Sequence, residues 1–393
     1  MSRNISIGID IGTCQVKVVA AENIMEAGNE RPKVIGVGFS ESRGLRHGYI
    51  LNQTDAVKSV RQALAQAEKA VGFPIKRAVA SIGGIGLGSI ISHGTVVISR
   101  ADFEITDLDV KKAVEASQQE IPATLSLNRK ILHTIPLSYK VDGRVVPGRP
   151  EGLKGNKLEV KTHFITCFEH HINDLLETLQ EAGIEVEDLV AAPIAASLVT
   201  LSKQQKMAGC VLANIGSETV SIVVFETNLP VSLEIFPYGS NDITNDIALG
   251  LRIPLEEAEG IKRGALIGGT YPRKKLEEII EARLSDIFEL IEAHLKKIGR
   301  SGLLPAGIVL TGGGSAIETI DDLAKASLRL PSRVASVSFG DTVRGQIKDA
   351  SWSVAYGLCL IGLELGEETP MSGEKLIKKT KKGLMNILRQ FLP

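Results

Sequence analysis

A short run of polar and glycine residues near the N-terminus has the composition of a phosphate-binding turn. Asp10, Gly12, Thr13 and Lys17 lie between two alternating apolar runs in SIGIDIGTCQVKVVAAE, which predicts a β-hairpin. Glycine in such a turn lets backbone N–H groups point at one anion, and the hydroxyl and ammonium groups add contacts. The Asp10 carboxylate is suited to hold the water shell of Mg²⁺, which uses few protein ligands. An ordinary surface hairpin is the alternative for this stretch taken alone.

A second copy of this pattern lies in the second half of the chain. The stretch VLANIGSETVSIVVFE, residues 211–226, aligns on the first copy without a gap, with Asn214 in the place of Asp10 and Gly216 in the place of Gly12. Long-period similarity of this kind indicates a duplicated unit. Because two such turns can bind one polyphosphate from opposite sides, we expect two lobes with a nucleotide in the cleft between them.

A third glycine turn follows a predicted strand in GIVLTGGGSAIETIDDLA, residues 307–324. Gly312, Gly313 and Gly314 allow a backbone to approach a ligand closely. Ser315 leads into a predicted helix, whose N-terminus favours anions. The glycine cluster GGIGLGS after the strand at 77–82 has no accompanying Walker-type lysine, and we interpret it as the entry into an inserted unit.

The C-terminal stretch GEKLIKKTKKGLMNILRQFLP has the pattern of an amphipathic helix. On a helical wheel the apolar residues share one half and the cations and amides the other, with Lys381 as the exception. This pattern suits a helix in a membrane interface with its cations on anionic head groups. A helix docked on the protein's own core, or one that binds a calmodulin-like partner, is the alternative. The expected membrane contacts are Leu376, Ile377, Lys378, Lys379, Lys382, Leu384, Met385, Leu388, Arg389, Phe391 and Leu392.

Composition narrows the class of protein. A chain of 393 residues is long enough for two or more domains. A formal net charge of -1 and an aromatic content of 4% argue against nucleic-acid binding. The four cysteines form no C-x-x-C pair, which indicates a reducing compartment and no zinc site. Since we find neither a secretory leader nor an apolar run long enough to span a bilayer, we expect a cytoplasmic protein that is not integral to the membrane.

The elements that position the first turn alternate between strands and helices. A third strand is predicted from Lys33, and a helix over 54–71 with Thr54 as its N-cap. After residue 161 the order strand, helix, strand, helix favours a layered α/β sheet. Residues between these parts form a small α+β module with a helix capped by Thr106 or Asp107.

The second half of the chain continues with a third strand and further predicted helices, one of them over LEEAEGIKRGALIG, residues 255–268. The helix ITNDIALGL is expected to be capped by Asn241 or Asp242. A long amphipathic helix covers 274–299, and a helix that is apolar on nearly all sides covers 351–362.

The histidines carry no metal-ligand spacing. We interpret His133 and His163 as half-buried strand residues rather than ligands. His170 and His171 are adjacent, so they cannot share one face of a helix.

Taken together, these motifs resemble the actin-like superfamily and, within it, the FtsA family of bacterial cell-division proteins. The resemblance covers nearly the whole chain. The segment 10–13 matches the first phosphate motif, 211–225 the second, 310–315 the adenosine motif and 355–358 the second connecting helix. The stretch ILHTIPLSYKVDG is similar to an extra subdomain of that family, which separates it from actin and from chaperone ATPases.

This resemblance implies an actin-like (ribonuclease H-like) two-lobed α/β ATPase fold that binds ATP, with Mg²⁺ held through water by Asp10. In AEGIKRG, Glu259 and Lys262 look like the family's ribose contacts, with a solvated surface pair as the alternative. The expected nucleotide-binding residues are Asp10, Gly12, Thr13, Cys14, Gln15, Lys17, Asn214, Gly216, Ser217, Glu218, Thr219, Gly239, Glu259, Lys262, Arg263, Gly312, Gly313, Gly314 and Ser315.

The resemblance also implies partners and a location. It implies filaments beneath the inner membrane, binding of the tubulin-like FtsZ through the second lobe, and recruitment of other divisome proteins. The C-terminal helix would attach this assembly to anionic lipids on the cytoplasmic face of the inner membrane at the division site. We expect no nucleic-acid partner.

The resemblance further implies a division of the chain into subdomains. The first lobe's core comprises residues 1–84 and 161–203, with the insert at 85–160. The second lobe's core comprises 204–227 and 303–362, with an outer subdomain at 228–302. A linker at 363–373 and an amphipathic helix at 374–393 complete the division.

The second phosphate motif departs from the superfamily pattern. It usually reads Asp-x-Gly-Gly-Gly-Thr, whereas this chain reads Asn214-Ile-Gly-Ser-Glu-Thr. An amide in place of the carboxylate removes a negative charge near the metal and a base for the attacking water. We therefore expect ATP binding with weak or absent hydrolysis. Glu218 either repels phosphate or supplies a substitute carboxylate.

Two other functions fit parts of the pattern. An FtsA-like pilus assembly protein of the PilM type shares the lobes and the insert but lacks the basic amphipathic tail. A small-molecule kinase of the same superfamily needs an acid placed as a base for a substrate hydroxyl, and we find no convincing candidate.

Overall fold

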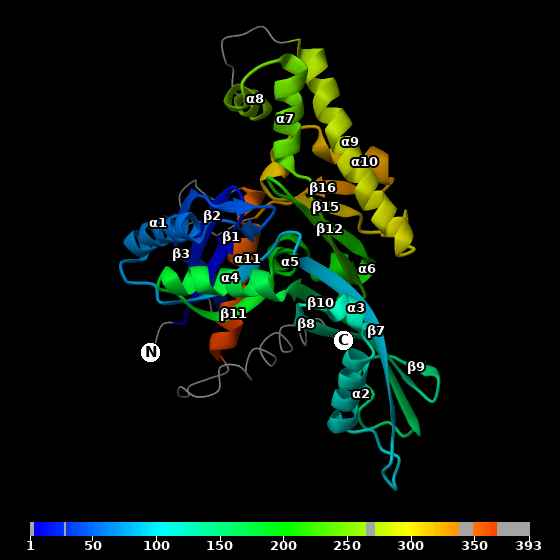
Figure 1. Ribbon diagram of the computed structural model, residues 1–393. Helices are drawn as coiled ribbons and strands as arrows, with labels where there is room; N and C mark the ends of the chain where they lie inside the picture. The colour runs from blue at the N-terminus through cyan, green and yellow to red at the C-terminus, as the bar shows by residue number, and fades with distance from the viewer. Residues whose placement is uncertain (1–3, 27–28, 265–271, 338–348, 368–393) are drawn as a thin grey trace.

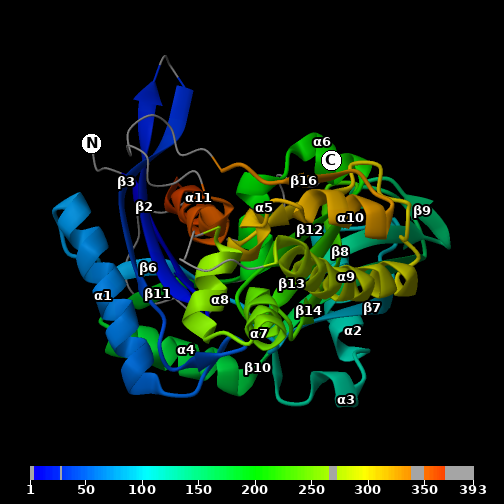
Figure 2. The ribbon, with the colours of Figure 1, turned by 90° about the horizontal axis from the view of Figure 1, so that it is seen from above.

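The computed structural model describes residues 4–26, 29–264, 272–337 and 349–367. Its first lobe is built on a five-stranded sheet with the order β11-β6-β1-β2-β3 (Figure 1). β1, β2 and β3 pair antiparallel, whereas β6 is parallel to β1 and β11 is parallel to β6. The β2–β3 hairpin extends beyond the rest of this sheet (Figure 2). The strands are β1 (Ile5–Ile11), β2 (Gln15–Glu26), β3 (Asn29–Glu41), β6 (Arg77–Ile82) and β11 (Glu185–Ala191).

The second lobe repeats this sheet. Its order is β14-β13-β12-β15-β16. Taken from the other edge, β16-β15-β12-β13-β14 matches β11-β6-β1-β2-β3 strand by strand, with the same pairing directions. The duplication predicted from the two turns is confirmed by this shared order. The strands are β12 (Cys210–Ile215), β13 (Val220–Glu226), β14 (Leu229–Phe236), β15 (Ile308–Thr311) and β16 (Ser332–Val334).

Helices cover the first sheet and fill the space between the lobes. The N-cap of α1 is Asn52, whose side chain accepts a hydrogen bond from the Asp55 N–H, so the predicted cap at Thr54 is wrong. α5 and α11 pack closely, and a Cβ added to Gly357 would lie 2.0 Å from the Ala195 carbonyl oxygen. The helices are α1 (Gln53–Val71), α4 (Glu169–Glu181), α5 (Ala192–Thr200), α6 (Lys203–Ala208) and α11 (Ser353–Glu367), with the 3₁₀ turn η2 (Ala350–Trp352) before α11.

One hydrophobic core runs through the base of both lobes. It contains Ile9 of the first sheet, Leu212 of the second, and Ala195 and Leu358 from the two helices between them, and all four side chains are buried. The equivalent ends of β1 and β12 are therefore held in one frame by a shared core.

Of the remaining second-lobe helices, α7, α8 and the start of α9 project upward in Figure 1, whereas α10 lies beside the second sheet. The N-cap of α7 is Gly239, not the predicted Asn241 or Asp242, because the Asp242 carboxylate accepts the Gly239 N–H at 2.7 Å. The long helix predicted to be amphipathic is α9, and its apolar residues Leu284, Ile287, Ile291 and Leu295 are buried in a core with the second sheet. The helices are α7 (Ser240–Leu251), α8 (Leu255–Lys262), α9 (Arg273–Lys297) and α10 (Ile320–Leu328), with the 3₁₀ turn η1 (Gly313–Ala316).

The inserted module is an α+β unit with its own sheet, ordered β7-β10-β8-β9. Thr106 caps α2, as one of the two predicted caps. Short strands β4 (Leu45–Arg46) and β5 (Tyr49–Ile50) precede α1 in the first lobe. The elements of the module are β7 (Leu87–Val97), α2 (Asp107–Gln119), α3 (Ala123–Ser126), β8 (Arg129–Val141), β9 (Arg144–Val146) and β10 (Lys157–Phe168).

Two histidines of the module are structural. His163 is buried, and its Nδ1 contacts the Pro230 carbonyl of the second lobe at 2.8 Å. His133 Nε2 accepts the Ala191 N–H at 3.0 Å. Burial lowers the pKa of His133 to about 3 and that of His163 to about 4, so both are neutral. Both are buried rather than half-buried, because each ring receives backbone partners from outside its own sheet.

Candidate functional site

The turn between β1 and β2 and the turn between β12 and β13 line one cavity of about 940 Å³. The third glycine turn and helix α8 line the same cavity. Most residues predicted to bind nucleotide are therefore brought together. These are Asp10, Gly12, Thr13, Cys14, Gln15, Lys17, Asn214, Gly216, Ser217, Thr219, Glu259, Lys262, Arg263, Gly312, Gly313 and Gly314. Three predicted residues, Glu218, Gly239 and Ser315, are not among those that line it.

The two hairpin turns have the same internal hydrogen bond. The Gly12 N–H donates to the Gln15 carbonyl at 3.1 Å, and the Gly216 N–H donates to the Thr219 carbonyl at 2.9 Å. A Cβ at Gly12 or Gly216 would lie 3.0 Å or 2.9 Å from the same carbonyl oxygen, closer than side chains normally approach. Each turn therefore needs a glycine, and the two turns share one backbone arrangement where they line the cavity.

Asp10 lies at the end of β1 and is held by Ser81 at the end of β6. The Ser81 hydroxyl donates to Asp10 Oδ1 at 2.7 Å. Burial raises the pKa of Asp10, while Lys17 and the Ser81 hydrogen bond act in the opposite direction. Ser81 was not predicted as a site residue. Only the parallel pairing of β1 and β6, which the sequence did not establish, places the carboxyl ends of these two strands side by side.

Lys17 of β2 connects the first hairpin to the 3₁₀ turn η2, which precedes α11. Its Nζ donates to the Ser351 carbonyl at 2.8 Å and lies 5.7 Å from the centre of the Trp352 ring. Burial lowers its pKa, with Asp10 and Asp349 acting in the opposite direction. The ammonium group is thus anchored at the edge of the cavity beside the Asp10 carboxylate.

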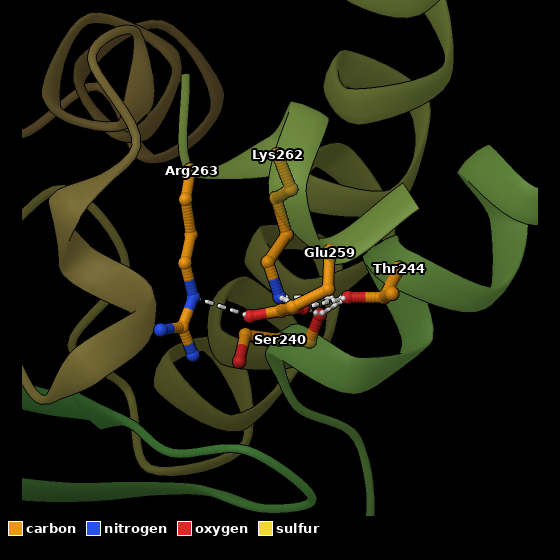
Figure 3. Close-up of polar contacts among 5 residues, drawn as sticks. All are labelled: Ser240, Thr244, Glu259, Lys262 and Arg263. Atoms are coloured by element: carbon orange, nitrogen blue, oxygen red, sulfur yellow. Dashed lines mark hydrogen bonds and ion pairs between the residues drawn. The ribbon is translucent and has the colours of Figure 1, made fainter. Parts of the chain in front are cut away.

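A polar cluster on α7 and at the end of α8 contributes to the lining of the cavity from the second lobe (Figure 3). Lys262 Nζ contacts Glu259 Oε2 at 2.6 Å and donates to Thr244 Oγ1 at 2.7 Å and to the Ser240 carbonyl at 3.0 Å. Arg263 Nε donates to Glu259 Oε1 at 2.7 Å. The Lys262 side chain is only 7% exposed, so the solvated surface pair considered above does not describe it.

The charge state of this cluster follows from its contacts. Burial alone would raise the pKa of Glu259, but hydrogen bonds from Lys262, Thr244 and Arg263 outweigh it and lower the pKa. Glu259 is therefore an anion that holds two cations at the cavity wall. Ser240 and Thr244 were not predicted as part of this wall.

The third glycine turn packs against the second hairpin turn. Gly312 has a φ of +88°, and a Cβ there would lie 2.3 Å from Asn214 Oδ1. A Cβ at Gly314 would lie 2.5 Å from Ile215 Cγ2, whereas one at Gly313 would meet no atom within 4 Å. Gly312 and Gly314 thus permit the close approach of the two turns, and Gly313 faces open space in the cavity.

Two of the three predicted residues outside the cavity lining, Ser315 and Gly239, contact other parts of the second lobe. Ser315 lies in η1, where its hydroxyl donates to the Gly312 carbonyl at 2.7 Å. Because α10 begins only at Ile320, the predicted helix start at Ser315 is wrong. A Cβ at Gly239 would lie 2.4 Å from the Ser217 carbonyl oxygen, so a glycine there lets α7 approach the second turn.

Other predicted features lie partly or wholly outside the described residues. All the expected membrane contacts, from Leu376 to Leu392, lie outside the described residues. Among the helices that the structure does describe, none is long and apolar enough to cross a membrane. No group of three or more His, Cys, Asp or Glu side chains suited to a metal ion occurs in the described ranges. A Mg²⁺ ion here would need phosphate and water as its main ligands, which is the usual pattern for this ion.

Comparison with known families matches two segments of the chain. A family model described as "Cell division protein FtsA" matches residues 211–357. A second model, "SHS2 domain inserted in FTSA", matches residues 84–166. The cell division protein FtsA of Bacillus subtilis is 33% identical over 85% of this chain and 79% of its own length. That of Pseudomonas aeruginosa is 30% identical over 91% of this chain and 89% of its own length.

Solved structures share the fold at low sequence identity. The PilM-PilN type IV pilus biogenesis complex aligns with a TM-score of 0.67 and 18% identity, over 91% of this chain and 98% of that one. MreB5 of Spiroplasma citri bound to ADP aligns with a TM-score of 0.54 and 13% identity, over 92% and 97%. These likenesses show an actin-like fold for this chain.

Proposed function

The chain belongs to the FtsA family of cell division proteins, and from this premise we propose that it binds ATP between its lobes and polymerises at the cytoplasmic membrane. In this proposal its filaments tether FtsZ to the membrane through the C-terminal helix and recruit other divisome proteins. The observation that carries the proposal is the pair of equivalent turns, built around Gly12 and Gly216, that line one cavity. Two equivalent glycine turns on one cavity suit one polyphosphate better than two separate ligands.

The residues in the cavity fit ATP and Mg²⁺ by their chemistry. Backbone N–H groups of the two turns suit phosphate oxygens, and Lys17 supplies a nearby cation. Glu259 and Lys262 present a carboxylate and an ammonium group, which suit the ribose hydroxyls. Asp10 is the carboxylate that would hold Mg²⁺ through water. When bound, Mg²⁺ supplies positive charge that offsets the repulsion between phosphate oxygens.

ATP acts in this proposal as a conformational ligand with little or no turnover. Asn214 occupies the position where a carboxylate would assist the attacking water, and an amide is neither a base nor an anion. ATP bound by both turns favours the closed cleft, which is the state competent for polymerisation. Binding needs only the N–H groups, so it tolerates the amide at Asn214 better than hydrolysis does.

A phosphate-release assay tests this point. The wild-type chain with ATP and Mg²⁺ is expected to release phosphate barely above the rate without protein. Asn214→Asp restores the carboxylate and is expected to raise the rate by about a hundredfold, the usual size of a general-base contribution. Rapid turnover by the wild-type chain would contradict the proposal, and binding of a fluorescent ATP analogue by both variants is the control.

Electron microscopy of lipid monolayers tests the function as a whole. The full chain on a monolayer with anionic head groups is expected to form filaments with ATP and Mg²⁺ present, and none with nucleotide removed by apyrase. Filaments that form equally well without nucleotide would count against ATP as the assembly ligand. A chain that never polymerises on the monolayer would count against the tethering role.

A further inference from the structure

Glu218 belongs to the second phosphate turn, yet its contacts are with the first lobe. Its Oε2 accepts the backbone N–H of His47 at 2.5 Å. Its own carbonyl oxygen lies 3.1 Å from His47 Nδ1. Since a carbonyl oxygen can only accept, Nδ1 carries the proton in this pair. The two residues are thus joined at two points across the cleft, through one backbone group and one side chain from each.

The first-lobe side of this contact is fixed in place. His47 has a φ of 48°, in the turn between β4 and β5, and its carbonyl accepts the Ile85 N–H at 3.2 Å. A Cβ at Gly48 would lie 2.4 Å from the Gly84 Cα, so the two backbones are in direct contact. Tyr49 stacks on His170 of α4 with 5.7 Å between ring centres. The turn that presents the His47 N–H is therefore packed against other parts of the first lobe.

The second-lobe side is equally well connected. The Ser217 carbonyl, one residue before Glu218, accepts the Asn241 N–H of α7 at 2.8 Å. The Gly216 carbonyl accepts the Ser240 N–H at 2.9 Å. A separation of the lobes that carried α7 and the second turn away from the first lobe would break both contacts of Glu218. The contact therefore favours one distance between the turn that carries Glu218 and the turn that carries His47, and its presence indicates that distance.

We infer that Glu218 is a positioning residue that holds the cleft closed around the nucleotide, and not a ligand of phosphate or metal. This inference rests on the proposed ATP site and adds the way its two halves are held together. A carboxylate bonded to an N–H group forms a charge-assisted hydrogen bond, which is stronger than a neutral one. The same bond directs the Glu218 carboxylate toward the first lobe. In agreement with this direction, Glu218 is not among the residues that line the cavity.

Two substitutions at Glu218 separate the effect of losing the hydrogen bond to His47 from the effect of losing the negative charge. Glu218→Gln keeps an oxygen that can accept the His47 N–H, whereas Glu218→Ala removes it. Stopped-flow measurement with a fluorescent ATP analogue and Mg²⁺ on the full chain is expected to show dissociation about tenfold faster for Glu218→Ala, the loss expected for one hydrogen bond to a charged group. Glu218→Gln is expected to stay within about threefold of wild type, because the rescued bond is then neutral.

Other roles for Glu218 give different results and would overturn the inference. If its charge repelled phosphate, both variants would bind the analogue more tightly than wild type. If it were a metal ligand, both variants would need a higher Mg²⁺ concentration for binding. A purely local structural role would lower the thermal stability of the nucleotide-free protein in Glu218→Ala without changing the dissociation rate.

Hydrogen exchange tests the contact without nucleotide. The amides of residues 44–50 are expected to exchange faster in Glu218→Ala than in wild type and Glu218→Gln, because the His47 N–H loses its acceptor. Unchanged exchange in Glu218→Ala would overturn the contact itself. Should the wild-type chain fail to bind ATP, the proposed function fails, but this exchange measurement still decides whether Glu218 holds the lobes together.

Discussion

A chain that ends at Gly373 is expected to lose its binding to anionic vesicles. The removed segment carries the apolar face and the cations from which membrane binding was predicted. Each cation near an anionic surface contributes about 1 kcal/mol, and each buried CH₂ about 0.8 kcal/mol. The loss of several such groups corresponds to at least about a hundredfold in vesicle affinity. Co-sedimentation with vesicles that contain phosphatidylglycerol, at matched protein concentration, measures it.

Two full-length variants separate the apolar and the charged contributions to this binding. Leu384→Glu with Leu388→Glu keeps the length and places charge on the apolar face, so it is expected to reproduce the truncation. Lys378→Gln with Lys379→Gln and Lys382→Gln is expected to lower binding mainly at low salt, where electrostatic attraction is strongest. Sedimentation of the truncated chain to the same extent as the full chain would show that membrane binding, if any, uses another part of the molecule.

Gly313→Leu is expected to abolish ATP binding while leaving the fold intact. A Cβ at this position meets no protein atom within 4 Å, and the residue lines the cavity. A leucine side chain there occupies ligand volume instead of clashing with the protein. We expect the affinity for ATP to fall by at least about a hundredfold, or about 2.7 kcal/mol. Isothermal titration calorimetry with ATP and Mg²⁺ measures the change.

Two matched substitutions make this result specific to the site. Gly313→Ala adds one carbon at the same place and is expected to lower the affinity much less than leucine does. Gly312→Ala adds the same carbon where it would meet Asn214 Oδ1 at 2.3 Å, so it is expected to lower the melting temperature of the nucleotide-free protein. Gly313→Leu should not lower it. Unaltered ATP affinity in Gly313→Leu would mean that nucleotide does not use this cavity wall.

The parts of this protein that could be predicted were those that depend on local pattern. The alignment of the two turns around Gly12 and Gly216 predicted a duplicated two-lobed unit, and the shared strand order confirms it. The family and the actin-like fold were predicted from the same motifs, and both are confirmed. Repetition was decisive, because the first turn alone is also compatible with a simple hairpin.

The parts that could not be predicted depend on contacts between segments far apart in the sequence. Glu218 and His47 are 171 residues apart, and no periodicity links them. Ser81 is 71 residues from the Asp10 carboxylate to which it donates, and only the parallel pairing of β1 and β6 brings the two together. Helix starts were misplaced for a local reason, because several neighbouring residues could serve as the cap. Asn52 and Gly239, not the polar residues that follow them, occupy the N-cap positions in three dimensions.

The central claim is that two equivalent turns bind the same ATP molecule, and a crystal structure of the chain with ATP and Mg²⁺ tests it most directly. We expect phosphate oxygens within about 3 Å of backbone N–H groups in both the Gly12 turn and the Gly216 turn. It also predicts the ribose beside Glu259 and Lys262, and the Glu218 carboxylate still on the His47 N–H. A nucleotide held by one turn alone, or bound outside this cavity, would contradict the account.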